Sequence, residues 1–233
     1  SKLATLKNAG DLSAAIKSCI TSLQSIQGRR GNWYHEYNNP FVTANALIAL
    51  KDAADAGFDV DQVAITKGLQ SLANDRFDDG SFPYYSSQRK LMNKPGNRQQ
   101  LAGAAGRMPL CELALFRWGK SSDRRLKHAI AMSLQYHRLL KSAYKYDNHT
   151  SNYAYGGFFF WYDMKSRTEA IGYVADDETR KRFYRQQRAL VMALPEIDGC
   201  FVDSHELGRV YGTAMALICL AGDDVDATHH ATD

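Results

Sequence analysis

The residues whose types and spacing could do metal chemistry lie near the carboxyl end of the chain. Asp198, Cys200 and His205 offer the oxygen, sulfur and nitrogen ligands that bind zinc in proteins. The Asp-x-Cys pair, however, belongs to a glycine–aromatic turn, completed by Gly199 and Phe201, that recurs upstream. His205 also follows Cys200 too closely to supply a distant third ligand. We therefore interpret the motif as a structural turn and predict neither a metal nor a cofactor.

Two pairs of charged residues recur at shared positions of an internal repeat. Arg107 and Arg209 each follow a glycine four residues before the small residue that opens a helix, and Glu112 and Glu169 share another position. Charged side chains in otherwise apolar helices are costly unless they are paired or hydrated. We favour an arginine–carboxylate pair that holds neighbouring hairpins together. The alternative is that these groups face a cavity, where they would bind an anionic ligand or take part in acid–base chemistry.

Aromatic residues gather at the turns between helices. Those that follow a turn glycine (Trp33, Phe82, Phe158 and Phe201) are expected to stack between hairpins. Other rings could line one mouth of a central cavity, where aromatic faces suit isoprenoid chains, carbocations or sugar rings. The candidates for this mouth, with two histidines from the turns, are His35, Tyr37, Tyr84, Tyr85, Tyr155, Trp161, His205 and Tyr211.

The elements that position these residues form four copies of a helix–turn–helix unit. Apolar residues recur at the spacing of one helix face, and no strand-like alternation of useful length is present. We place the units at about 11–57, 58–119, 120–176 and 177–222, followed by a tail at 223–233. Helices are predicted at 11–26, 41–54, 61–75, 107–118, about 123–144, through 168–171, at 178–194 and at 209–221.

The register of the units follows from their glycine–aromatic turns. Overlaying these turns aligns the small residues that open the second helix of each unit, which are Thr43, Cys111, Thr168 and Thr213. FVTANALIAL and YGTAMALICL then match almost position for position. A single unit cannot bury its apolar helix faces, so neighbouring units must stack. The sequence therefore predicts one all-α domain, an α/α toroid-like stack of about four helical hairpins with about eight main helices.

Composition narrows the choice of function. Hydrophobic residues make up 45% and charged residues 23% of the 233 residues, as expected for one soluble globular domain. The net charge of +4 comes mostly from clusters at 124–127 and 180–188, which we interpret as solvated faces of outer helices. A nucleic-acid-binding protein would carry a denser basic face, and a membrane span needs an apolar run of about 18 residues. We expect neither.

Three stretches resemble the repeat units of the terpenoid cyclase and protein prenyltransferase superfamily. They are DDGSFPYY, GNWYHEYNNPFVTANALIAL and DGCFVDSHELGRVYGTAMALICL. The resemblance, to prenyltransferase and squalene-cyclase-type repeats, implies an α/α toroid with inner and outer helices and a central cavity. The chain lacks the DxDD motif of the class II cyclases, and its Asp-x-Cys pair lies in a turn rather than at the start of an inner helix.

Two classes of function are consistent with these observations. The first is a non-catalytic toroid that binds a hydrophobic or sugar-like small molecule, or a protein, through its cavity or concave face. The second is a cyclase-like or prenyltransferase-like enzyme that acts on an isoprenoid, with a polysaccharide lyase as a third case. The missing motifs favour the first class.

Overall fold

The structure is a computed structural model, and it describes residues 9–35, 37–84, 104–142, 144–145 and 159–225. Within these residues the chain forms nine α-helices and one minimal antiparallel pair, β1 (Tyr34–His35) with β2 (Tyr37–Asn38). The helices are α1 (Ala9–Ser25), α2 (Pro40–Asp55), α3 (Gln62–Asp75), α6 (Met108–Arg117), α7 (Asp123–Gln135), α8 (His137–Lys141), α9 (Phe159–Gly172), α10 (Asp177–Met192) and α11 (Gly208–Val225). The prediction of a helical fold is confirmed.

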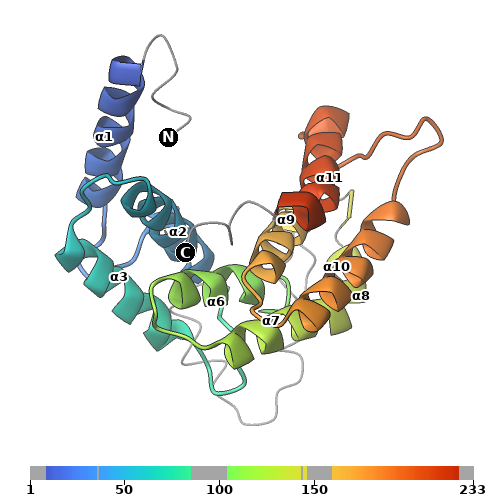
Figure 1. Cartoon of the computed structure of the whole chain (residues 1–233), viewed down its shortest axis with the longest axis horizontal. Helices are drawn as coiled ribbons and strands as arrows, with labels where there is room; N and C mark the ends of the chain where they lie inside the picture. The colour runs from blue at the N-terminus through green and yellow to red at the C-terminus, as the bar shows by residue number, and fades with distance from the viewer. Residues whose placement is uncertain (1–8, 36, 85–103, 143, 146–158, 226–233) are drawn as a thin grey trace.

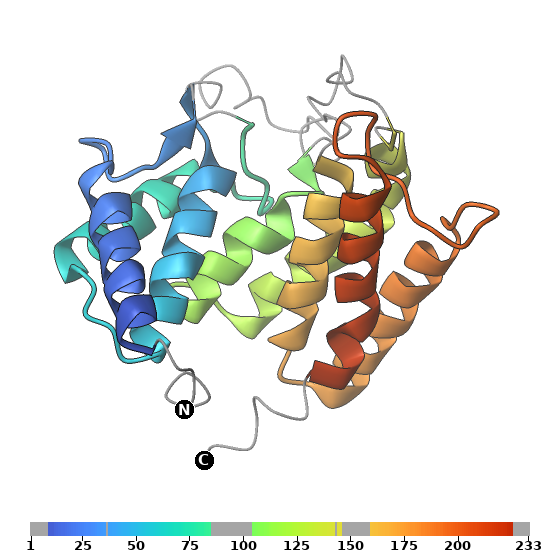
Figure 2. The same ribbon diagram turned by 90° about the horizontal axis from the view of Figure 1, so that it is seen from above.

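The main helices stand in two curved rows (Figures 1 and 2). In the inner row, α2 packs against α6, α6 against α9, and α9 against α11. In the outer row, α1 covers α2, α3 covers α2 and α6, α7 covers α6 and α9, and α10 covers α9 and α11. Figure 1 shows an open arc with α1 at one end and α11 at the other, so closure into a toroid stays a prediction.

Side-chain caps fix where the outer helices begin. The carboxylate of Asp61 accepts hydrogen bonds from the backbone amides of Val63 and Ala64, at 2.8 and 3.3 Å. Ser122 caps α7 in the same way, and Asp176 caps α10 by accepting from the amide of Thr179 at 3.0 Å. Such caps satisfy amides that have no partner inside the helix. Because the caps are local, the sequence places these starts to within one residue.

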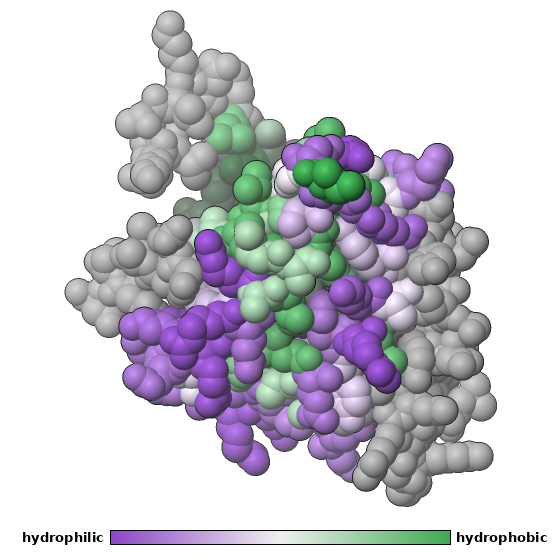
Figure 3. All heavy atoms as spheres, turned by 90° about the vertical axis from the view of Figure 1, so that its right-hand side faces the viewer, coloured by the Kyte–Doolittle hydropathy of each residue, from purple (hydrophilic) through white to green (hydrophobic). Residues whose placement is uncertain are grey.

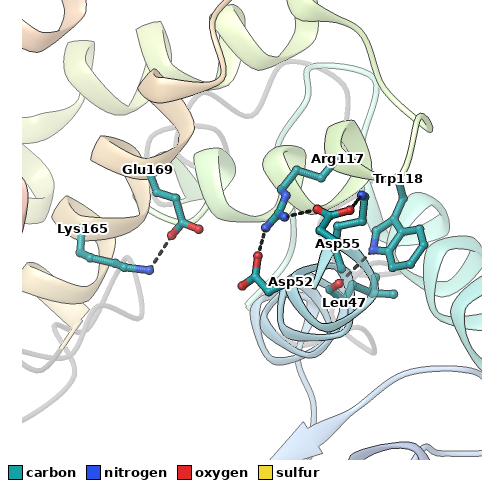
Figure 4. Close-up of polar contacts among 8 residues, drawn as sticks. Leu47, Asp52, Asp55, Arg117, Trp118, Lys165 and Glu169 are labelled. Carbon is teal, nitrogen blue, oxygen red and sulfur yellow. Dashed lines mark hydrogen bonds and ion pairs between the residues drawn. The ribbon is translucent and has the colours of Figure 1, made fainter. Parts of the chain in front are cut away.

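The inner helices α2 and α6 are joined by a polar clamp (Figure 4). Arg117, at the end of α6, forms ion pairs with Asp52 at 2.5 Å and Asp55 at 2.9 Å, both in α2. The indole nitrogen of Trp118 donates to the backbone oxygen of Leu47 at 2.9 Å. This clamp fixes the register of the first two inner helices.

The predicted register of the first and fourth units is confirmed by a shared hydrogen-bond pattern. The hydroxyl of Thr43 accepts from the backbone amide of Trp33 at 3.1 Å and lies 3.2 Å from its carbonyl oxygen. The hydroxyl of Thr213 makes the same two contacts with Phe201, at 3.0 and 3.2 Å. Two hairpins far apart in sequence therefore attach their turns to their second helices by the same contact.

The predicted register of the third unit is wrong. Helix α9 begins at Phe159, so Trp161 lies in its first turn, and Thr168 lies late in the helix instead of opening it. The hydroxyl of Thr168 donates to the carbonyl of Met164 within α9, at 3.0 Å. The physical reason is that the rings at the start of α9 are needed in the core, where Phe160 and Trp161 are fully buried. The turn aromatic proposed for this unit, Phe158, lies outside the described residues.

The helix expected over about 123–144 is divided. It comprises α7 and the short α8, with Tyr136 between them. His137 and Leu140 of α8 are buried, so the change of direction turns these side chains into the second core cluster.

The core forms two clusters, and the larger one extends from α1 to α10. The larger one holds Trp33 and Phe82 between α2, α3, α6 and α7, and the smaller one packs Trp161 edge-on against Phe201, with ring centroids 5.6 Å apart. Trp33 reaches the next hairpin, because a Cβ on Gly68 of α3 would meet its ring at 2.8 Å. Trp33 and Phe201 therefore join hairpins, as predicted. None of the described helices is long and apolar enough to cross a membrane.

Candidate functional site

A polar pocket opens between the end of α3, the turn that follows it and the start of α7. Its volume is about 570 Å³. Its charged lining comes from the end of α3, the turn, α6 and the start of α7, and comprises Arg76, Asp78, Asp79, Glu112, Arg124 and Arg125, with His128 beside them. The pocket therefore lies at the outer side of the arc, not on the concave face where the sequence led us to expect a ligand.

The turn at 77–81 forms one wall of this pocket. The amide of Phe77 donates to the carbonyl of Ser81 at 2.9 Å, and the amide of Gly80 donates to the carbonyl of Phe77 at 3.0 Å. Asp79 accepts from both the amide and the hydroxyl of Ser81, at 2.9 and 2.6 Å. Gly80 has φ of +83°, and a Cβ there would approach the His128 ring at 3.2 Å. Glycine at this position lets α7 lie close to the turn.

Glu112 forms the floor of the pocket. It is 1% exposed, and its carboxylate accepts a hydrogen bond from Arg76 at 2.8 Å and another from the hydroxyl of Ser121. The arginine–carboxylate pair expected for Glu112 is present, but its arginine is Arg76 instead of Arg107. The pair joins α3 to α6 within one hairpin. Sequence reasoning missed Arg76 because a basic residue at a helix end usually faces solvent.

The wall formed by the start of α7 carries two arginine side chains. Arg124 and Arg125 are exposed in the first turn of α7 and form no ion pair within the described residues. Asp123 pairs with Lys127 at 2.6 Å, and the His128 imidazole lies 3.0 Å from the carbonyl oxygen of Asp79. Arg76 keeps further N–H groups beyond the one that Glu112 accepts. An anion in the pocket would meet three guanidinium groups.

A second polar cluster lies buried between α6 and α9, and sequence reasoning missed its central residue. Asp163 is 3% exposed, and no described group donates a hydrogen bond to it. Burial raises the pKa of its carboxyl to about 7, although the nearby charges of Arg107 and Arg167 act in the opposite direction. Arg107 itself donates to the carbonyl of Phe82 at 3.2 Å and lies over the Tyr84 ring. Nothing in the sequence indicates that Asp163, which follows a run of aromatic residues, is a buried carboxyl group.

Arg167 ties α9 to two outer helices. Its guanidinium is fully buried and donates to the side chain of Gln187 at 2.7 Å and to the carbonyl and hydroxyl of Ser133 at 3.0 and 3.1 Å. Gln187 in turn donates to the hydroxyl of Thr168 at 2.9 Å. This buried network spans α7, α9 and α10, so its first role is structural.

The charged residues that share a repeat position in the sequence lie in different environments. Arg209 is exposed and pairs with Asp198, whereas Arg107 is buried. Glu169 pairs with Lys165 on the surface of α9 (Figure 4), whereas Glu112 is buried. The two glutamates do not share a place in the structure, because Glu112 lies near the middle of α6 and Glu169 lies near the end of α9. The structure therefore brings only Glu112 into the pocket.

The Asp198 turn has the conformation expected of a structural motif. Asp198 accepts from the amide of Cys200 at 3.2 Å, and Gly199 has φ of +80°. The matching glycines Gly31 and Gly80 have φ of +85° and +83°. Among the described residues, no three His, Cys, Asp or Glu side chains gather as a metal site requires.

Among the described residues, the candidates for the cavity mouth lie in different environments. Tyr84 and Trp161 are buried in different core clusters, and the indole nitrogen of Trp161 donates to the carbonyl of Val202 at 2.9 Å. Tyr211 is half-buried, and His35 and His205 are exposed. The buried rings were expected at a cavity mouth but pack the core, because each fills the space between a turn and its helices. Tyr85, Tyr155 and the side chain of Tyr37 lie outside the described residues.

The inner row contributes one further polar contact between distant helices. The side-chain amide of Asn45 in α2 donates to the hydroxyl of Tyr162 in α9. Burial raises the pKa of this tyrosine above its ordinary value. The sequence did not predict this contact, since an asparagine and a tyrosine at these helix positions are typical of ordinary surface and core residues.

Comparison of the chain with protein-family models, with curated proteins and with solved structures finds no match in any of the three.

Proposed function

We propose that this protein is a non-catalytic helical-repeat protein that binds a small anionic ligand rich in hydroxyl groups, such as an acidic sugar, in the pocket between α3 and α7. The observation that carries the proposal is the presence of three arginines, Arg76, Arg124 and Arg125, in one pocket with three carboxylates, those of Asp78, Asp79 and Glu112. Arginine forks suit carboxylates, and mixed donors and acceptors suit sugar hydroxyls. The volume of about 570 Å³ falls in the usual range for small-molecule sites.

Preorganisation supports the same ligand class. Glu112 holds Arg76 at 2.8 Å from the floor of the pocket, so this guanidinium loses little freedom when a ligand arrives. Arg124 and Arg125 project from the capped start of α7, where the helix dipole adds a favourable field for an anion. An isoprenoid chain would gain little here, because burying it would desolvate the charged lining. The pocket therefore favours the sugar-like ligand of our two small-molecule alternatives.

Calorimetry with a ligand panel tests this proposal. The panel contains a uronic acid with its short oligomers, the neutral sugars of equal size and a prenyl alcohol. We expect the uronic acids to bind. The affinity of the double variant Arg124→Ala/Arg125→Ala for them should be about tenfold lower, because one or two charge-assisted hydrogen bonds are lost. The matched control Arg185→Ala/Arg188→Ala removes the same charge from exposed positions on α10 and should leave affinity unchanged. Equal binding of neutral sugars, or stronger binding of the prenyl alcohol, would refute the proposal.

A further inference from the structure

An apolar groove runs between the outer helices α7 and α10. Its volume is about 720 Å³. Ala131 and Leu134 line the α7 side, and Phe183, Ala189 and Leu190 line the α10 side. Phe183 is buried at the floor, the two leucines are half-buried, and Ala189 is exposed at the rim. The groove exists because α7 and α10 each pack on α9 and touch one another only sparingly.

The groove has the dimensions of a helix-binding site. Phe183 and Leu190 lie two turns apart on the same face of α10, so the apolar floor extends at least about 10 Å along the helix axis. Two roughly parallel ridges with an apolar floor between them accept the apolar stripe of a third helix. The groove is thus a continuation of the helix-on-helix packing that builds the whole arc.

The helices that form this groove are rich in basic residues. The sequence contains no Asp or Glu at 124–145 or at 179–195, although both segments are rich in Lys and Arg. Arg138, Arg182, Arg185 and Arg188 are exposed and form no ion pair within the described residues. The Arg182 guanidinium lies over the Phe183 ring, 5.5 Å from its centroid. Glu178, one turn before Arg182, is the acidic residue closest in sequence to this rim.

Arg182, of the cluster at 180–188 on α10, lines the groove, whereas Arg124 and Arg125, of the cluster at 124–127 in α7, line the ligand pocket. Figure 3 shows, on the side of the molecule where α10 and α11 lie in Figure 1, apolar surface running between hydrophilic areas. An apolar groove with the exposed Arg182 at its edge suits a ligand with an apolar stripe and an acidic flank.

We propose that the α7–α10 groove binds an acidic amphipathic helix of a partner protein. The apolar face of that helix would lie on Leu134, Phe183 and Leu190, and its carboxylates would face Arg182 and its neighbours. Apolar burial supplies affinity, while the complementary charges supply orientation and a fast association rate. Nucleic acid fits less well, since phosphates gain nothing from an aliphatic floor and the single aromatic ring in the groove is buried and cannot stack on a base. The inference does not depend on the proposed ligand pocket.

Fluorescence anisotropy with the whole chain tests this proposal. The probe is a labelled synthetic peptide of about 18 residues, or about five helical turns, with one leucine stripe and glutamates elsewhere. A second peptide carries lysine in place of each glutamate. We expect the acidic peptide to bind and the basic peptide not to bind. Raising the salt concentration should weaken binding, because the flanking charges are exposed.

Charge substitutions locate the site. Ala189→Glu places a carboxylate at the rim of the groove, and Arg182→Glu reverses a flanking charge. Each substitution should lower the affinity for the acidic peptide by about tenfold. Two control substitutions on the exposed face of α1, Ala14→Glu and Lys17→Glu, change the charge by the same amounts and should leave binding of the acidic peptide unchanged. Gln135→Glu, on the α7 wall, is an independent variant if either α10 substitution lowers the melting temperature.

Three outcomes would overturn the proposal. The first is failure of the acidic peptide to bind the unsubstituted protein. The second is equal weakening by the α10 and α1 variants, which would mean that only net charge matters. The third is displacement of the peptide by single-stranded RNA at equal concentration, which would assign the face to nucleic acid. Loss of uronic acid binding in Arg124→Ala/Arg125→Ala with peptide binding retained would separate this site from the ligand pocket.

Discussion

Arg76 and Glu112 form an ion pair at 2.8 Å that links the outer helix α3 to the inner helix α6. Both side chains are largely withdrawn from water, with 15% and 2% of their side-chain surfaces exposed. Each charge is therefore costly without the other. The pair has two consequences, since it holds a hairpin together and it orients one of the three arginines of the proposed ligand pocket.

Removing one partner of this pair should destabilise the protein strongly. Arg76→Met keeps the aliphatic stem but leaves Glu112 as an uncompensated buried charge, so we expect the free energy of unfolding to fall by about 3 kcal/mol. The double variant Arg76→Met/Glu112→Leu should recover much of this loss, because it removes both charges. Urea unfolding of the single and double variants measures the coupling. A loss no larger than that of Arg124→Met, an exposed arginine of the same pocket, would contradict the structural role.

Asp163 should make the protein less stable as the pH rises from 4 to above 7. Burial raises the pKa of its carboxyl to about 7 in the folded protein, against an ordinary value of 3.8. The folded state therefore binds the proton more tightly than the unfolded state. This contribution is fully present below pH 3.8 and is lost as the pH rises through 7, and its size is on the order of 4 kcal/mol. Thermal unfolding of Asp163→Asn across this range should lack the decline.

His137 should have the opposite effect. Burial lowers the pKa of its imidazole to about 3, and the charges of Arg167 and Lys141 act in the same direction. The unfolded state takes up a proton below pH 6.5, whereas the folded state does not, so stability is present above 6.5 and is lost as the pH falls toward 3. His137→Leu should remove this loss.

Because the two effects oppose each other, the two single variants should differ in the sign of their pH dependence. Relative to the unsubstituted protein, Asp163→Asn should gain stability with rising pH between 4 and 6.5, and His137→Leu should lose it. The double variant should resemble the unsubstituted protein in slope. Parallel curves for the two single variants would show that these groups do not titrate as their burial requires.

The sequence specifies local features of this fold better than its long-range contacts. The outer helix starts could be predicted because Asp61 and Asp176 act on amides two or three residues away. The turn glycines could be predicted because Gly31 and Gly199 recur before an aromatic residue. The register of α9 could not, since the aromatic run from Phe158 to Tyr162 fits either a turn or a buried helix start, and tertiary packing selects the second. Membership of the terpenoid cyclase superfamily stays a prediction.

In the candidate site, too, the sequence specifies local features better than long-range contacts. Glu112 was identified because a carboxylate in an apolar helix needs a partner, and a partner is present. That this partner is Arg76 depends on how α3 lies against α6, which periodicity does not encode. Asp163 was missed for a related reason, because its raised pKa comes from complete burial between α6 and α9. The grouping of Arg124 and Arg125 with Arg76 is likewise a property of the outer row.

The hydroxyls of Thr43 and Thr213 should contribute unequally to stability although they make the same contacts with the turn aromatic. Thr→Val keeps the shape of the side chain but leaves the amide and the carbonyl of the turn aromatic without their partner. Thr43 is 1% exposed, so water cannot replace its hydroxyl, and Thr43→Val should cost about 2 kcal/mol. Thr213 is half-buried, and Thr213→Val should cost about 1 kcal/mol or less.

Thr43→Ser retains the hydroxyl and serves as the control. If Thr43→Ser lowers the free energy of unfolding as much as Thr43→Val does, the hydrogen bonds are excluded as the cause.

The repeat glycines Gly31 and Gly199 offer a matched test of how tightly neighbouring hairpins pack. Both have positive φ, so alanine at either position carries a backbone penalty of about 1 kcal/mol. A Cβ on Gly199 would meet no described atom within 4 Å, whereas a Cβ on Gly31 would overlap the backbone carbonyl of Lys67 in α3. We therefore expect Gly199→Ala to cost only the backbone penalty, and Gly31→Ala to cost about 3 kcal/mol or more, because α3 must move away from the first turn. Urea unfolding measures both, and equal losses would show that the first turn does not lie against α3 as closely as the structure places it.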